Sequence, residues 1–153
     1  MSFFHFFRRI ASTIVNQKGY DRVKWNKRSK RRRNIEMNYE INMHTNDIVV
    51  IRLFGELDHH EAERIRTDIS RTILQGNLQT IIWNLERLNF MDSSGIGLIL
   101  GRMRELTAVN GQTIILNPSN TMKKIFQFSG LGNFMFEGTE EEAILSARGI
   151  VNG

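Results

Sequence analysis

A short apolar run that leads into a polar turn constrains the fold of this chain more than any other feature. The run is Thr80-Ile81-Ile82-Trp83-Asn84-Leu85, and it is apolar on both faces. Such a strand is typical of the centre of a sheet that helices cover. The turn Asp92-Ser93-Ser94-Gly95 follows, and a helical pattern begins there. The chain is therefore expected to pass from a buried strand into a helix at two serines.

Strand and helix patterns alternate through the rest of residues 37–153. Further strands are expected at Asn38–His44, Ile48–Phe54, Thr113–Leu116 and Phe134–Phe136, with the first paired to the second across Thr45-Asn46-Asp47. Helices are expected from the cap Asp58 to about Gln75, from Ser94 to Val109, from Pro118 to Phe128, and from the cap Thr139 through Ile150. This alternation predicts an α/β sandwich with a mostly parallel central sheet, an antiparallel edge and about four helices.

The helix after the two serines has a recognisable core face. Its apolar residues recur three and four positions apart: Ile96, Ile99, Leu100, Met103 and Leu106. Gly95 directly precedes the first residue of this stripe, and Gly97 directly follows that residue. If the helix start lies against the neighbouring strand, even one added methyl group would force the two elements apart. Both glycines are therefore expected to resist enlargement.

The positive charge of the chain is concentrated in its first 36 residues. This segment holds 11 Lys and Arg against Asp21 and Glu36, which gives +9, whereas residues 37–153 carry −4. A mildly acidic domain predicts no direct DNA contact. Residues 1–36 have neither helical nor strand periodicity, so we expect a disordered basic extension. Another hypothesis is a start site assigned too early, since AGG codons at Arg31–Arg33 would form a ribosome-binding site upstream of Met37.

Several classes of site are disfavoured by composition. Cysteine is absent, which rules out disulfides and thiolate zinc sites and fits a reducing cytoplasm. No apolar run approaches the roughly 18 residues that a membrane span needs. His59 and His60 are adjacent and point about 100° apart on a helix, so a solvated first turn is favoured over a metal site. We expect neither a cofactor nor a metal.

The two serines of the turn allow three interpretations. The first is plain helix capping, in which Asp92, Ser93 or Ser94 accepts a backbone N–H. The second is a nucleophile elbow, which is disfavoured because the G-x-S-x-G pattern is absent and no His or acid is marked as a partner. The third is phosphorylation, since a helix N-terminus tolerates the added negative charge. Spacing alone does not choose among these interpretations.

A resemblance to a known family favours the third interpretation. Two segments carry the resemblance: Phe54-Gly55-Glu56-Leu57-Asp58-His59-His60 and Phe90–Gly97. Both resemble segments of the anti-sigma factor antagonists of the STAS class. The resemblance is strongest to the antagonists that control the first forespore sigma factor in sporulating bacteria. Shorter matches are Asn84-Leu85-Glu86, Gly101-Arg102 and Phe128-Ser129-Gly130-Leu131. The resemblance covers about Met37 to Ile150. It implies a STAS fold and a regulatory protein that is not an enzyme.

The resemblance also implies roles for individual residues. Ser93 matches the serine that family members carry as phosphoacceptor. Asp58 matches an acid that helps engage the partner kinase, and we expect Asp92, Ser94 and Gly95 to complete the partner-binding surface. The implied partners are an anti-sigma factor that is also a serine kinase and a serine phosphatase. The alternative is an adaptor that binds nucleic acid or a membrane surface through residues 1–36.

Overall fold

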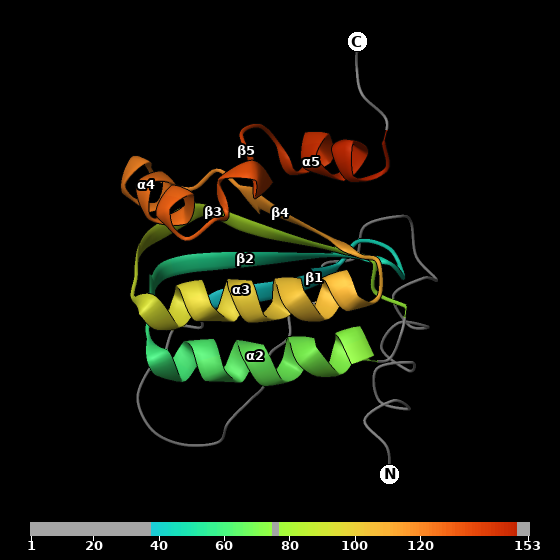
Figure 1. Ribbon diagram of the computed structural model, residues 1–153, viewed down its shortest axis with the longest axis horizontal. Helices are drawn as coiled ribbons and strands as arrows, with labels where there is room; N and C mark the ends of the chain where they lie inside the picture. Colours follow the sequence, from blue (N-terminus) through green and yellow to red (C-terminus); the bar gives the residue numbers. More distant parts are fainter. Residues whose placement is uncertain (1–37, 75–76, 150–153) are drawn as a thin grey trace.

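The computed structural model describes residues 38–74 and 77–149 and shows a sheet with helices packed on it (Figure 1). The sheet has the strand order β1-β2-β3-β4-β5. Its strands are β1 (Tyr39–Met43), β2 (Ile48–Leu57), β3 (Thr80–Met91), β4 (Gln112–Leu116) and β5 (Met135–Phe136). β1 is antiparallel to β2 and every other neighbouring pair is parallel, which confirms the predicted sheet. The predictions for residues 1–36 lie outside the described residues.

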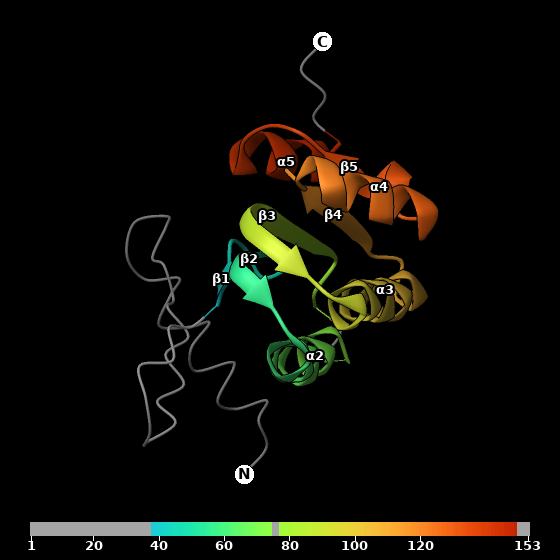
Figure 2. The same cartoon turned by 90° about the vertical axis from the view of Figure 1, so that its left-hand side faces the viewer.

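The helices in the described part of the chain are the four that the sequence predicts. They are α2 (His59–Leu74), α3 (Ser93–Ala108), α4 (Asn120–Phe128) and α5 (Glu140–Ala147), with a 3-10 turn, η1 (Gly132–Phe134), before β5. α2 and α3 lie side by side against one face of the sheet, and α5 covers the other (Figures 1 and 2). The chain therefore has the sandwich architecture expected of it.

Several element boundaries differ from the predicted ones. β2 and β3 run on to Leu57 and Met91, because their parallel pairing continues through two irregular steps in register. α3 begins at Ser93 because Asp92 takes the cap position. α4 begins at Asn120, since the Ser119 hydroxyl accepts the backbone N–H of Met122 at 3.3 Å. Phe134 belongs to η1. The predicted helix ends at Gln75-Gly76 and Ile150 lie outside the described residues.

The predicted caps of α2 and α5 are confirmed. Asp58 accepts the backbone N–H of Glu61 at 2.9 Å. Thr139 and Glu142 form a capping box, with the two reciprocal hydrogen bonds at 2.8 and 3.1 Å. These contacts satisfy N–H groups that a helix start otherwise leaves without partners. Local sequence therefore fixes where both helices begin.

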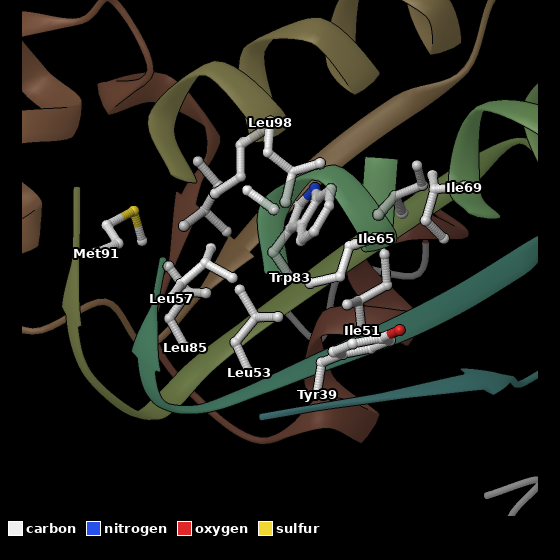
Figure 3. Packing of buried hydrophobic residues seen from close by; sticks show 14 of the residues in the cluster. Tyr39, Ile51, Leu53, Leu57, Ile65, Ile69, Trp83, Leu85, Met91 and Leu98 are labelled. Carbon is white, nitrogen blue, oxygen red and sulfur yellow. The ribbon is translucent and has the colours of Figure 1, made fainter. Parts of the chain in front are cut away.

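The core lies on both faces of β3, as its apolar pattern predicts. The larger cluster contains Trp83 and the inner faces of α2 and α3 (Figure 3), and the smaller one places Ile82 against α5. In α3 the predicted residues Ile99 and Leu106 are fully buried, and Ile96, Leu100 and Met103 are partly buried against the cluster. Leu98 is also buried, although it falls outside the predicted stripe.

The two glycines at the start of α3 have different surroundings. A Cβ on Gly95 would lie 3.0 Å from side-chain atoms of both Leu57 and Met91. A Cβ on Gly97 would meet nothing within 4 Å, so the expectation that Gly97 resists enlargement is wrong. Gly97 lies on the outer side of the helix, where the neighbouring strand does not reach it. Of these two glycines, Gly95 is the one needed for close packing against the sheet.

These surroundings predict opposite effects for two substitutions. Gly95→Val should lower the free energy of unfolding by about 1–3 kcal/mol, because its methyl groups overlap Leu57 and Met91. Gly97→Ala should leave it unchanged or raise it by up to about 1 kcal/mol, since alanine favours a helix over glycine. Chemical denaturation of the two variants and the parent measures both changes. Equal stability of all three proteins would contradict the packing argument.

Candidate functional site

Two helices begin at the same edge of the sheet. β2 and β3 are parallel, and their last residues, Leu57 and Met91, are register partners. Asp58 and Asp92 each follow directly, and α2 and α3 then start side by side (Figure 1). The C-terminal ends of parallel strands are a common place for binding sites in α/β proteins. The segments with the sequence-predicted site residues are therefore brought together, although they are 34 positions apart.

The start of α3 displays one of the two serines. Asp92 is the N-cap, and its carboxylate accepts the backbone N–H of Ser94 at 2.8 Å. Ser93 is the first residue of the helix and its side chain is exposed. A phosphoryl group there would lie at the positive end of the helix dipole, where anions are stabilised. The backbone geometry therefore suits a group that gains negative charge.

The start of α2 lies beside it and carries a carboxylate. Asp58 is exposed, and one of its oxygens holds the N-cap hydrogen bond to Glu61. A carboxylate has two oxygens with several acceptor positions, so the cap leaves Asp58 able to accept a further hydrogen bond from a partner. Asp58 is thus a structural cap that also faces solvent at the site.

His59 joins the two helix starts, and sequence reasoning missed this contact. Its Nδ1 lies 3.2 Å from the Ser94 hydroxyl oxygen, within hydrogen-bond distance. No local sequence pattern marks this contact, because it depends on α2 starting beside α3. Within the described residues no carboxylate hydrogen bonds to His59, so the contact lacks the third member of a catalytic triad.

The other predicted site residues have different surroundings. Ser94 is half-buried and Gly95 is buried, with its α-carbon turned toward β2 and β3. Gly95 therefore shapes the helix start, and its direct contact with a partner stays a prediction. Phe90 lies just before the turn and is 58% exposed. Aromatic residues are enriched at protein–protein interfaces, so an exposed Phe90 three positions before Ser93 is compatible with a binding surface.

A hollow lies on the face of the sheet that α5 covers, beside the start of α5. It has a volume of about 400 Å³ and includes Arg52, Asn84 and Glu140 in its lining. The Arg52 guanidinium binds Glu140 through two hydrogen bonds of 2.6 Å, and Glu140 raises the pKa of Arg52. Asn84 donates to the same carboxylate at 2.7 Å. These groups bind one another and hold α5 on the sheet.

Residues 38–74 and 77–149 contain neither a metal-binding cluster nor a membrane-spanning helix. No three side chains of the metal-binding types lie close enough together to hold an ion, and His59 and His60 are part of no such group. No helix in these ranges is long and apolar enough to cross a membrane.

The sequence is similar to those of known proteins. The STAS domain family matches residues 40–143. An anti-sigma F factor antagonist of Lysinibacillus sphaericus is 66% identical over 117 residues, which cover 76% of this chain and all of the relative. One from Paenibacillus polymyxa is 34% identical over 65% of this chain and 86% of the relative.

Solved structures give the same result. The structure of the anti-sigma factor antagonist SpoIIAA in its unphosphorylated form shares 66% identity with a TM-score of 0.71, covering 74% of this chain and 99% of that one. SpoIIAA in the phosphorylated form shares 67% identity with a TM-score of 0.65, covering 69% and 96%. The chain therefore belongs to the STAS domain family, among the anti-sigma factor antagonists.

Proposed function

We propose that this protein, when unphosphorylated, binds an anti-sigma factor that is also a serine kinase and thereby releases a sigma factor for sporulation transcription. Phosphorylation of Ser93 ends the binding. The observation that carries the proposal is the Ser93 side chain, which lies exposed at the first position of α3, directly after Asp92 and at the same edge of the sheet as Asp58. The 66% identity to an anti-sigma F factor antagonist supports the same function.

Electrostatics explains how one phosphoryl group can act as a switch. It adds roughly −1.5 to −2 charges at neutral pH. The N-terminus of α3 tolerates this charge, so the fold survives phosphorylation. The surface already carries Asp58 and Asp92, and the added charge makes it strongly negative. A partner that binds the neutral hydroxyl closely then faces an unpaired, desolvated anion, which weakens the complex.

The cycle needs an enzyme that removes the phosphate. We propose a serine phosphatase for this step, which returns the protein to its binding form. The protein itself serves as substrate and ligand in both steps. Because sigma factors act on RNA polymerase, we propose that the cycle runs in the cytoplasm. The protein affects transcription through its partner, and we propose no direct DNA contact.

Substitution of Ser93 tests the switch. Ser93→Ala should bind the kinase as tightly as the parent but accept no phosphate there, so the complex should persist in ATP. Ser93→Asp should weaken binding by about tenfold or more, because it adds negative charge at the interface. Calorimetric titration measures the affinities, and mass mapping of the phosphopeptide identifies the acceptor. Phosphate on Ser94 alone in the parent protein would overturn the assignment of Ser93.

A second test separates the two roles of Asp58. Asp58→Asn should keep the melting temperature nearly unchanged, because asparagine caps helices about as well as aspartate. Kinase affinity or the phosphorylation rate should nevertheless fall, since the carboxylate is a proposed partner contact. Asp58→Ala is the control that removes the cap as well and should cost about 1 kcal/mol of stability. If Asp58→Asn binds the kinase and accepts phosphate as the parent does, Asp58 serves only as the N-cap of α2 and makes no partner contact.

Removal of the basic extension distinguishes the two candidate functions. A protein that starts at Met37 should fold, bind the kinase and accept phosphate as the full chain does. An adaptor that acts through residues 1–36 would lose its binding instead. Thermal denaturation and kinase titration at physiological salt compare the two proteins. Loss of kinase binding on truncation would show that the extension takes part in the switch.

A further inference from the structure

We propose that His59 determines which serine is phosphorylated, by engaging the Ser94 hydroxyl and leaving the Ser93 hydroxyl for the kinase. The inference rests on the proposed function, because it concerns the choice between two acceptors at that site. Both serines have a primary hydroxyl, and they are adjacent in the chain. Their chemistry is therefore the same, and the surroundings of each hydroxyl must decide the choice.

The surroundings of the two hydroxyls differ in two ways. The Ser94 hydroxyl oxygen lies 3.2 Å from Nδ1 of His59, and Ser94 is half-buried. The Ser93 side chain is exposed, and its hydroxyl makes no hydrogen bond to another described residue. Only the Ser94 hydroxyl must therefore give up an existing hydrogen bond before it can react.

Phosphoryl transfer requires a hydroxyl that can turn toward ATP. The serine oxygen attacks the γ-phosphorus, and the new O–P bond forms as the bond to the β,γ-bridging oxygen breaks. ADP leaves with that oxygen, and the hydroxyl proton passes to a base of the kinase. The attacking and leaving oxygens must lie roughly in line. The imidazole of His59 turns the Ser94 hydroxyl toward α2 instead.

Both members of this contact are held in place by the fold. His59 is the first residue of α2 and follows Asp58, whose side chain caps that helix. The backbone N–H of Ser94 is bound to Asp92, the cap of α3. Both helix starts follow strand ends that are register partners. The sheet therefore sets the positions of the two backbone segments that carry the imidazole and the Ser94 hydroxyl.

A histidine beside a serine can also have the opposite effect. In many enzymes the imidazole acts as a base and makes the serine a better nucleophile. That role needs a histidine oriented by a third group, and no carboxylate among the described residues binds His59. If His59 activated Ser94, its removal would lower phosphorylation of Ser94. The two effects thus predict opposite changes.

The test is the ratio of phosphate on Ser94 to phosphate on Ser93 after incubation with the kinase and ATP, measured by phosphopeptide mass mapping. His59→Gln should raise this ratio about five- to tenfold, the factor that one hydrogen bond of ordinary strength is worth. His59→Asn should keep the parent ratio, because asparagine carries its amide nitrogen at the position of Nδ1. His60→Gln is the matched control, since the His60 side chain makes no hydrogen bond to Ser94.

A ratio compares two sites in one molecule, so weaker kinase binding or lower stability of a variant does not affect it. An unchanged or lower ratio in His59→Gln would overturn the role proposed for His59. An equal rise in His59→Asn, or in His60→Gln, would also overturn it. If the parent protein carries no phosphate on Ser93, the proposed function fails, and this outcome is distinguishable from failure of the inference about His59.

Discussion

The parallel pairing of β2 with β3 is the constraint on which the site depends. It places Leu57 opposite Met91, so the chain leaves the sheet at two neighbouring points and enters two neighbouring helices. The caps Asp58 and Asp92 then fix where each helix begins. Gly95 permits the close approach of α3 to these strand ends. The exposed position of Ser93 follows from the three features together.

This arrangement separates the switch from the core. Apolar side chains of β2, β3, α2 and α3 pack together in the core (Figure 3), while Ser93 and Asp58 are exposed. In the proposed function, a change in charge at Ser93 therefore acts on a partner at the surface without disturbing the packing that supports the fold. The pairing of Arg52 with Glu140 holds α5 on the other face, away from the site. A regulatory protein benefits from this separation because it must be modified and restored repeatedly.

Much of the fold could be predicted from the sequence because its signals are local. Each element has its own signal in the sequence. β3 is marked by its apolar run, and the starts of α2 and α5 by the caps Asp58 and Thr139. α3 is marked by the spacing of apolar residues such as Ile99 and Leu106. The resemblance to the STAS class then predicted Ser93 as the phosphoacceptor, and this role stays a prediction. The longer strands could not be predicted in the same way, because irregular register between β2 and β3 breaks the simple alternation of buried and exposed residues.

The errors concern contacts between elements. Gly97 resembles Gly95 in sequence, and only the position of the strands distinguishes the packed glycine from the open one. The contact of His59 with Ser94 joins residues 35 positions apart, so no local pattern reveals it. One error is local instead: Pro118 is expected to begin α4, but Ser119 is the N-cap, since its hydroxyl accepts the backbone N–H of Met122. Tertiary placement thus decides the details that matter for the chemistry of the site.

The affinity of the kinase for the protein before and after complete phosphorylation of Ser93 tests the central claim most directly. Calorimetric titration of both purified forms, at the same salt concentration and with the site of the phosphate verified by mass mapping, gives the two dissociation constants. The account predicts that the phosphorylated form binds at least about tenfold more weakly, because a dianion replaces a neutral hydroxyl at the interface. Equal affinity of the two forms would show that phosphorylation of Ser93 does not control the partner.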